Sequence, residues 1–357
     1  MASTIKEIAQ RLNLSISTVS YALNDGPKPV SEAVARQVKE LARELGYRPN
    51  RLAKSLITGR IHTIGIVPIA AEADILATPS SSAFFNGAFN AAARLRQDVL
   101  VFTAHDRNKP DQVVDDILDS RVDGVVLIAP RLDSPALRQI EQSSLPYALA
   151  AGPEGHPHCY HVDDAQGARA AVEYLISLGH RRIAHVTGNP ALGDSAIRRD
   201  TYVEVMRHRQ LLVPDEYIVI GDYLRASGYR AGIRFAEMKD RPTAIFCGND
   251  DMAFGVMDAF RRAGLSVPGH VSVVGFDDTP LAAHEQLTTV RQPLQQITGD
   301  AFNAVVNQIQ TGDRPPGARY PALLIERGST APAPEPPFKA LSRTARRPDS
   351  ILRNAVT

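Results

Sequence analysis

The sequence predicts an N-terminal α-helical domain of the helix-turn-helix type, followed by a larger α/β body with two lobes. At 357 residues the chain exceeds one ordinary domain. Helix-forming segments in the first 60 residues show the spacing of a helix-turn-helix, whereas residues 61 to about 330 alternate short apolar strands with amphipathic helices. This alternation occurs in two successive series, which indicates two similar lobes.

The charge of the chain is divided unevenly. Residues 1–60 hold 10 Lys and Arg against 5 Asp and Glu, whereas residues 61–330 hold 25 against 32. The segment 331–357 is basic again, so the total of +1 hides a basic head on an acidic body. This asymmetry indicates a polyanionic partner for the head, although a solvated basic face without a partner would give the same charge.

Composition excludes several other classes of protein. The cysteines, Cys159 and Cys247, lie far apart and outside any cluster of metal-ligand spacing, so we expect no disulfide framework, metal site or cofactor. The chain starts without the apolar core of a signal peptide, and no apolar run approaches the ~18 residues of a membrane helix. We therefore expect a cytoplasmic protein with no membrane partner.

The first helix is predicted from the capping box at residues 4–7 and ends near Leu12, where Asn13 favours a tight turn. Counted from residue 5, the small Ala9, the turn-forming Asn13 and the apolar Val19 stand at positions 5, 9 and 15. This spacing lets two helices cross closely and predicts a helix-turn-helix, although an ordinary helical hairpin would share part of the pattern.

The second helix, near residues 14–24, is the candidate DNA-reading element. Its apolar residues Val19, Ala22 and Leu23 share one face at spacings of three and four. The side chains predicted to point elsewhere are small, polar or aromatic, as suits contacts with base edges; they are Ile16, Ser17, Ser20 and Tyr21. A third helix, from Ser31 to Gly46, completes a small bundle.

A helix-competent basic segment follows at residues 50–60 and is too short to be stable alone in water. Its basic residues surround Ala53 and Leu56, a combination expected of a minor-groove element with an apolar wedge. The alternative is a basic linker with two leucines placed by chance.

Six motifs in this head closely resemble the lactose/purine-repressor (LacI/GalR) family: Thr4–Ala9, Ser17–Ser20, Ala22–Asn24, Val30–Ser31, Leu45–Asn50 and Ala53–Leu56. The resemblance implies that Ile16, Ser17 and Tyr21 face major-groove bases, and that Thr18 and Ser20 face phosphates. It further implies that a hinge helix enters the minor groove of an operator bound by a homodimer, with Leu56 as the wedge. The hinge residues assigned to DNA are Arg51, Ala53, Lys54 and Leu56.

Tyr21 departs from the arginine or histidine that is common in this family. Arginine reads guanine through two hydrogen bonds, whereas tyrosine offers one hydroxyl and a ring edge. The base read at this position is therefore open.

The body is predicted to contain buried parallel strands separated by helices. The first lobe has strands near 64–67, 99–102, 124–128 and 147–149, with helices near 83–97, 110–120 and 133–143. The second has strands near 182–186, 217–220, 244–247 and 271–274, with helices near 165–178, 194–209, 225–238 and 249–263. A helix near 291–312 returns to the first lobe, and 323–325 is the last strand. Ligands of such sheets bind beyond the carboxyl ends of the strands, here between the lobes.

The body also resembles the same family, and more loosely the periplasmic sugar-binding proteins, through motifs that include Gly179–Ile183, Asn249–Ala253 and Val273–Asp278. The resemblance covers roughly residues 3–330 and implies a small-molecule effector in the cleft. Arg198 matches the effector arginine, and Asp277 matches the acceptor after a second-lobe strand. The amide of Asn249 serves either the ligand or a helix cap. The aromatic candidates, for which core packing is the alternative role, are Phe84, Phe85, Tyr223 and Phe246.

Two departures leave the effector open between a sugar and a nucleoside or purine-like compound. Residues 150–153 are Ala-Ala-Gly-Pro, where a ligand-binding Asp is frequent, and residues 70–83 form an insertion. The chain has no Trp, which excludes a tryptophan platform for sugar stacking.

These patterns predict a transcriptional repressor that binds a pseudo-palindromic operator as a dimer, or as a tetramer, under the control of an effector that is either inducer or corepressor. An enzyme is disfavoured because the common nucleotide-binding and hydrolase motifs are missing, so no catalytic residue is assigned. A transport binding protein would not need the basic head. The predicted domains are a DNA-binding domain at 1–48, a hinge at 49–60, an effector-binding body at 61–330 and a disordered tail at 331–357.

Overall fold

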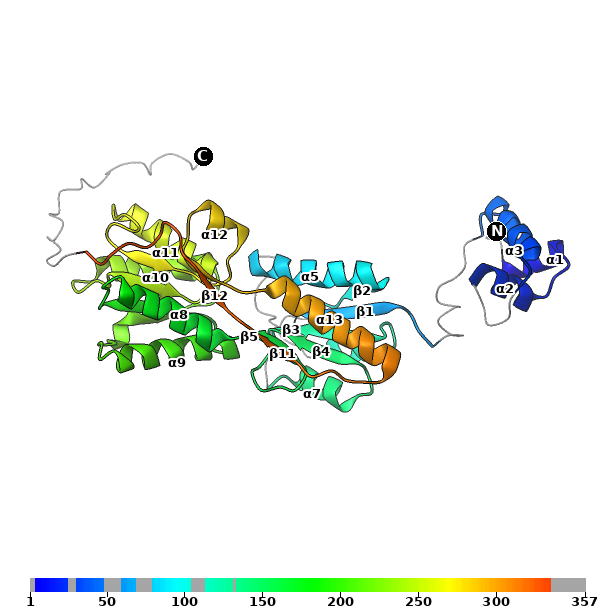
Figure 1. Cartoon of the computed structure of the whole chain (residues 1–357), viewed down its shortest axis with the longest axis horizontal. Helices are drawn as coiled ribbons and strands as arrows, with labels where there is room; N and C mark the ends of the chain where they lie inside the picture. The colour runs from blue at the N-terminus through cyan, green and yellow to red at the C-terminus, as the bar shows by residue number, and fades with distance from the viewer. Residues whose placement is uncertain are drawn as a thin grey trace, which may run out of the picture.

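The computed structural model describes residues 4–24, 30–47, 59–68, 79–103, 113–130 and 133–334. The head is a bundle of α1 (Ile5–Arg11), α2 (Ile16–Asn24) and α3 (Glu32–Glu44), shown in Figure 1. Its core is small and wholly apolar, and consists of Ile8, Ala9, Val19, Ala22, Val38 and Ala42. The small Ala9 and the buried Val19 lie in this core, as the helix-turn-helix spacing predicts.

The ends of the head helices follow from local chemistry. The Thr4 hydroxyl accepts a hydrogen bond from the Glu7 amide at 3.3 Å, and Ser31 caps α3 by accepting from the Val34 amide. Asn13 adopts the left-handed conformation, with φ of 50°, and so makes the turn between α1 and α2. Gly46 ends the bundle in the same conformation, at a φ of 61°. These features confirm the predicted turn and helix boundaries.

The first lobe contains a parallel sheet with the strand order β11-β5-β4-β3-β1-β2. Its strands are β1 (Thr63–Pro68), β2 (Asp98–Val101), β3 (Gly124–Ile128), β4 (Tyr147–Ala150), β5 (Cys159–Val162) and β11 (Ala318–Tyr320). Helices α5 (Pro79–Leu95) and α13 (Leu294–Thr311) pack on one face, whereas α6 (Val113–Leu118) and α7 (Pro135–Gln142) pack on the other. The sheet is therefore covered on both faces, as parallel sheets require.

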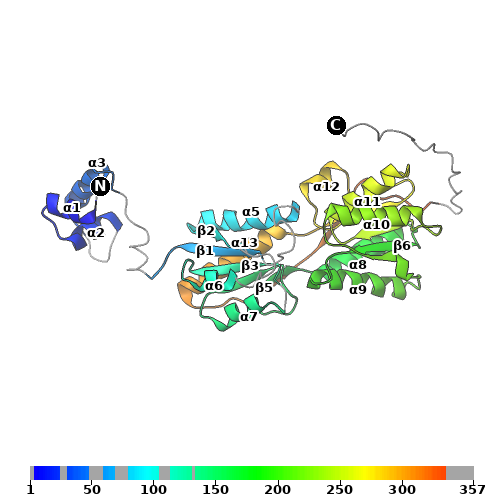
Figure 2. The same cartoon turned by 180° about the vertical axis from the view of Figure 1, so that it is seen from behind.

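The second lobe repeats this plan with the strand order β7-β6-β8-β9. Its strands are β6 (Ile183–Thr187), β7 (Ile218–Ile220), β8 (Ala244–Cys247) and β9 (Ser272–Val274). Helices α8 (Asp164–Ser177) and α9 (Gly193–His208) cover one face, and α10 (Arg225–Glu237) and α11 (Asp250–Arg262) cover the other. Figure 2 shows this lobe from behind, with α10 and α11 in front. The short 3₁₀-helix Asp215–Tyr217 and α12 (Pro280–His284) complete it.

Within the described residues the chain passes between the lobes from β5 into α8, from β10 (Thr289–Arg291) into α13, and from β11 into β12 (Leu323–Ile325). β10 and β12 form an antiparallel pair beside the crossing points. The return of α13 to the first lobe confirms the prediction for the segment near 291–312.

The predicted strands and long helices are all present, and the predicted two-lobed α/β fold is confirmed. Sequence periodicity missed β5, β10 and β11, because each spans three or four residues and mixes polar with apolar side chains. The predicted tail begins at residue 331, yet the Ala331 amide donates to Ser272 and the Ala333 amide to the Leu178 carbonyl. The residues from 335 onward lie outside the described part. Among the described helices, none has the length and apolar character needed to cross a membrane.

Candidate functional site

Helix α2 has a buried face and an open face. Val19 and Ala22 are buried in the head core, whereas Ile16 is 46% exposed although it is a large apolar residue. Ser17 is exposed, and Tyr21 is half-buried on the same helix. An exposed isoleucine beside serine and tyrosine gives this helix the apolar and polar groups that base edges require.

The start of α2 is capped by Ser15, the residue that precedes the helix. The Ser15 hydroxyl accepts from the Thr18 amide at 3.0 Å and lies 2.8 Å from the Thr18 hydroxyl. This cap fixes the first turn of the helix, where amides of a helix N-terminus can meet phosphates. Thr18, predicted to face phosphate, is therefore half-buried and engaged in the cap. The hinge residues Arg51, Ala53, Lys54 and Leu56 lie outside the described residues.

The predicted effector residues of the second lobe gather beyond the carboxyl ends of its strands. Tyr223 follows β7, Asn249 follows β8 and Asp277 follows β9, and Arg198 reaches them from α9. Because the strands are parallel, residues distant in sequence meet at one edge of the sheet, which is where ligands of such sheets bind.

Arg198 is buried at the centre of this edge, with its side chain 4% exposed. Its Nε donates to Asp164 Oδ1 at 2.8 Å, and its Nη1 donates to the Gly248 carbonyl at 2.6 Å. Asp194 lies one helical turn away, 3.5 Å from Nη2. The guanidinium carbon lies 3.7 Å from the centre of the Phe276 ring. The arginine is thus fixed before any ligand arrives.

Acidic groups outnumber this cation. Burial raises the pKa of Asp164 to about 6, and the Arg198 guanidinium acts in the opposite direction. Burial and the neighbouring Asp250 raise the pKa of Asp277 well above its usual range. Burial alone would lower the pKa of Arg198, but Asp164 and the other nearby groups more than offset this and raise it. The site therefore keeps its cation, and a raised carboxyl pKa favours the neutral acid, which can donate as well as accept hydrogen bonds.

Tyr223 lies at the carboxyl edge of the second-lobe sheet and occupies the space beside Gly188. A Cβ placed on Gly188 would overlap the Tyr223 ring, so any larger residue there would require the ring to move. The Tyr223 hydroxyl donates to Asp194 at 2.8 Å, and its backbone is held in the left-handed region with φ of 67°. This tyrosine thereby connects the β7 loop to the start of α9.

Of the two roles predicted for Asn249, the structure shows the helix cap. Its Oδ1 accepts from the Met252 amide at 2.9 Å, which caps α11, and its Nδ2 donates to the Tyr223 carbonyl at 2.9 Å. The amide therefore positions Tyr223 and α11, and a ligand role for Asn249 stays a prediction.

Comparison with known proteins places the chain in a family. Residues 4–50 match the bacterial regulatory proteins of the lacI family, and residues 172–330 match the periplasmic binding protein-like domain. The transcriptional repressor CytR of Escherichia coli K12 is 32% identical over 341 residues, which cover 93% of this chain and 98% of that protein. This chain belongs to the LacI family. The ribose operon repressor of the same organism is 31% identical over 339 residues, covering 92% and 99%.

Solved structures agree on the fold of this LacI-family regulator. The lac repressor dimer bound to operator and the anti-inducer ONPF superposes with a TM-score of 0.82 at 24% identity, over 93% of this chain and 100% of that one. The complex of the regulator CelR with cellobiose superposes with a TM-score of 0.70 at 26% identity, over 92% and 99%. The chain is therefore a DNA-binding transcriptional regulator and not an enzyme.

The aromatic candidates of this LacI-family chain pack mainly in its core. Phe246 is fully buried, and its ring stacks 4.7 Å from that of His185. Phe85 is buried in the first-lobe cluster, whereas Phe84 is only partly buried against it. Core packing therefore accounts for Phe246 and Phe85, and their roles as cleft walls stay predictions.

Sequence reasoning missed several groups that the fold brings into contact with Arg198 or Tyr223; they are Asp164, Gly188, Asp194 and Phe276. Only Asp194 carried a sequence signal, because it lies four residues before Arg198 on one helix. His185 was also missed. Burial lowers the pKa of His185 to about 4, and its Nε2 has no hydrogen-bond partner within the described residues.

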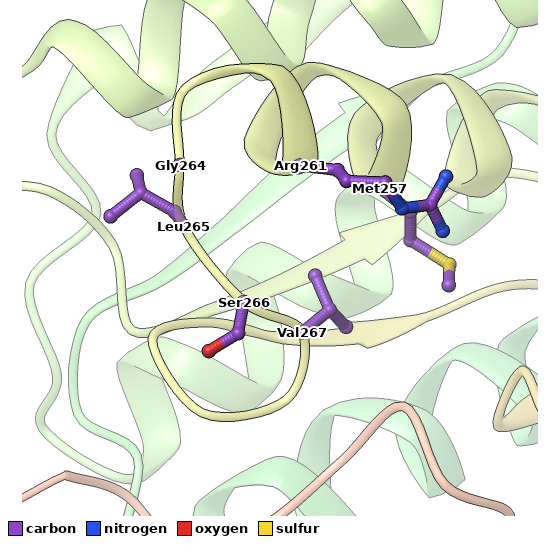
Figure 3. Close-up of a pocket in the computed structure, with 6 residues that line it drawn as sticks. All are labelled: Met257, Arg261, Gly264, Leu265, Ser266 and Val267. Carbon is purple, nitrogen blue, oxygen red and sulfur yellow. The ribbon is translucent and has the colours of Figure 1, made fainter. Parts of the chain in front are cut away.

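A separate depression lies at the carboxyl end of α11. It has a volume of about 330 Å³ and is lined by Met257, Arg261 and residues 264–267, as Figure 3 shows. None of the predicted effector residues lines it. All the residues that line this depression belong to the second lobe, and none of them contacts Arg198, so it is distinct from the site around that arginine.

Proposed function

We propose that this LacI-family regulator represses transcription by binding a pseudo-palindromic operator as a homodimer, and that a small neutral effector in the cleft around Arg198 controls this binding. The single observation that carries the DNA-binding role is the two-faced helix α2. It buries Val19 and Ala22 and exposes Ile16 and Ser17. The proposal assigns residues 1–48 to the head, 49–60 to the hinge and 61–330 to the effector body, working in the cytoplasm.

Two symmetry-related heads would read two half-sites in successive major grooves, which explains the requirement for a dimer.

The first lobe offers a surface for the second copy. β2 is an edge strand of its sheet, and it exposes Val101, which is 38% accessible. Phe89 on the neighbouring α5 is 48% exposed. Large exposed apolar groups beside an open strand edge are typical of an interface.

The hinge assignment rests on the family resemblance. In it, Leu56 separates a base step from the minor groove and Ala53 makes close contact there, with the basic Arg51 and Lys54 beside them. In the major groove, Tyr21 faces the bases with Ile16 and Ser17, and Thr18 and Ser20 face the phosphates. This arrangement predicts a bent operator and an affinity that falls steeply with salt, because basic groups displace counterions.

The chemistry around Arg198 favours an effector rich in hydroxyl or ring N–H donors. Arg198 is already paired with Asp164, so a second anion would find its charge neutralised. Asp277 and Asp194 offer carboxyl oxygens to donors. Sugars and nucleosides both have this chemistry. Among the similar proteins, one is named the ribose operon repressor, and the regulator CelR was solved in complex with cellobiose.

Selection from randomised duplex DNA tests the DNA-binding role. The full-length chain is expected to enrich a palindromic sequence, and binding of scrambled DNA with equal affinity would contradict the proposal. A thermal-shift screen with D-ribose, cellobiose, adenosine and cytidine, next to glucose 6-phosphate and AMP as anionic counterparts, tests the effector class. Stabilisation by a neutral compound is expected; a preference for the phosphorylated ones would contradict the assignment.

A further inference from the structure

We propose that helix α13 links the effector cleft to the end of the hinge, where the chain enters the body, and that Gln292 and Arg60 are the positioning residues at the two ends of this helix. This inference rests on the proposed function, since it specifies how occupancy of the cleft would reach the head. It assigns a role to two residues outside the effector site and outside the DNA-reading helix.

The cleft end of this link is a side-chain hydrogen bond between the crossing segment that precedes α13 and the second lobe. The Gln292 side chain, which lies just before α13, donates from Nε2 to Asp277 Oδ1 at 2.6 Å. Asp277 follows β9 of the second lobe and also lies in the field of Arg198. An effector that hydrogen-bonds to the Asp277 carboxyl must share or displace the Gln292 amide. Binding therefore changes the side-chain contact of the segment before α13, which is also held by the backbone hydrogen bond from the Gln292 amide to the Asp277 carbonyl at 3.4 Å.

The helix itself is held firmly in the first lobe. At 18 residues it is about 27 Å long, given a rise of about 1.5 Å per residue. Its buried face includes Ile297, Phe302 and Val305. Gly87 on α5 packs so closely that a Cβ there would overlap the Gln295 carbonyl oxygen. A packed helix of this kind moves as a unit, so displacement at its first turn reaches its last.

The far end of α13 meets the chain where it enters the body. Arg60 Nη2 donates to the Ile309 carbonyl at 2.7 Å. Ile309 lies in the last turn of the helix, where carbonyls lack partners within the helix and a cation is favoured by the helix dipole. Arg60, the last residue assigned to the hinge, thereby ties the entry of the chain into the body to the end of α13.

A second anchor holds the same residues on the other side. The Asp123 carboxylate accepts from the Ile61 amide at 2.8 Å and from the His62 amide at 2.6 Å. Asp123 directly precedes β3 at the amino end of the first-lobe sheet. Residues 60–62 are therefore held between the end of α13 and the start of β3. A shift of the helix against the sheet would change the direction in which the chain leaves the body toward the hinge.

A double-mutant cycle on operator affinity tests the link. Gln292→Leu removes the cleft contact and Arg60→Met removes the contact at the other end, in the full-length chain and with the selected operator duplex. The two sites lie about 27 Å apart by helix rise, so unlinked substitutions should combine additively within about twofold. The link predicts non-additivity of about fivefold or more in operator Kd. Additive effects would overturn it.

Arg209→Met is the matched control, because it removes the ion pair of Arg209 with Glu173 between two second-lobe helices. Its combination with Gln292→Leu should be additive.

Hydrogen exchange in the DNA-free chain gives a readout that does not depend on operator binding. Gln292→Leu is expected to speed exchange of the amides at residues 60–63 by about twofold or more, whereas Arg209→Met should leave them unchanged. Unchanged exchange in Gln292→Leu would overturn the link even if the operator selection succeeds. Failure of the selection with altered exchange would instead contradict the proposed function and leave the link standing.

Discussion

Arg198 and Asp164 form a buried ion pair, in which the guanidinium Nη2 lies 2.7 Å from the carboxylate Oδ1. Asp164 begins α8, just after the chain crosses from the first lobe, and Arg198 lies on α9. The pair thus fixes Arg198 to the crossing point. A charge left in such a site without its partner is strongly unfavourable.

Replacing Asp164 tests this anchoring. Asp164→Asn should lower the free energy of unfolding by about 3 kcal/mol, because it leaves the buried Arg198 without its main counter-charge. Asp194→Asn is the control, because Asp194 lies 3.5 Å from the guanidinium and is 33% exposed. It should cost less than about 1 kcal/mol. Urea denaturation at neutral pH measures both, and equal losses would contradict the anchoring role of Asp164.

A pair of glycine substitutions tests the placement of Tyr223. Gly188→Ala would put a methyl group into the space that the Tyr223 ring fills and should cost about 1 to 3 kcal/mol of stability. Gly193→Ala should be neutral or slightly stabilising, since no atom lies within 4 Å of the place that its Cβ would take and it begins a helix.

Removing the Tyr223 ring should relieve the overlap with a methyl group at position 188. The double variant Gly188→Ala with Tyr223→Ala is therefore expected to lose less stability than the two single variants together. Thermal melting measures the four proteins. Additive losses would show that Tyr223 does not fill the space in front of Gly188.

The stability of the second lobe should depend on pH through Asp250. Burial raises the pKa of Asp250 to about 6, although hydrogen bonds from Thr289 and Thr279 act against this shift. A folded-state pKa above the unfolded value means that the contribution of this group is fully present below about pH 4 and is lost as the pH rises through about 6. The unfolding free energy attributable to Asp250 should fall by up to about 3 kcal/mol over this range.

Denaturant titrations between pH 4 and 7 measure this dependence. Asp250→Asn should reduce the slope of the profile, because one of the buried carboxyl groups with a raised pKa no longer titrates. Profiles of the same slope in Asp250→Asn and in the unsubstituted protein would contradict the prediction.

The outcome at individual residues shows how far a sequence can be read. The head was predictable because its signals are local: Thr4 caps the helix that it precedes, and Asn13 makes its own turn. The ion pair of Arg198 with Asp164 was not, because the two residues lie 34 positions apart and meet only through the packing of α8 against α9. β11 was missed because Ala318–Tyr320 becomes a strand only through its pairing with β5.

Asn249 shows a limit of another kind. Its sequence position suits both a helix cap and a ligand contact, and only the geometry of the Met252 amide and the Tyr223 carbonyl assigns its present partners. Phe246 likewise has the strand-end position of a cleft residue, but alternation along β8 turns it onto His185. The chemical group that a residue supplies can thus be predicted from sequence, whereas the partner toward which its side chain points cannot.

The hinge prediction is tested through Leu56. Leu56→Ala is expected to reduce operator bending and to weaken operator binding by about 1 to 3 kcal/mol, since the wedge that separates a base step is lost. Leu212→Ala, a substitution at a residue 83% exposed on the second lobe, should leave both unchanged. Fluorescence energy transfer between the ends of the operator measures the bend. Normal bending and affinity in Leu56→Ala would remove the wedge assignment.

Tyr21 is the position at which the operator preference of this chain should be most specific to it. The residue lies half-buried on α2, five positions after Ile16 and four after Ser17, on the part of the helix that follows its capped first turn. Tyr21→Arg should shift selection from randomised half-sites toward guanine at one position, because arginine donates two hydrogen bonds to guanine, with discrimination of about 1 to 3 kcal/mol. Tyr21→Phe isolates the hydroxyl: if the hydroxyl reads a base, preference at that position should be lost while overall affinity changes little. An identical selected sequence for all three proteins would mean that residue 21 does not contact a base and that specificity lies with Ile16 and Ser17.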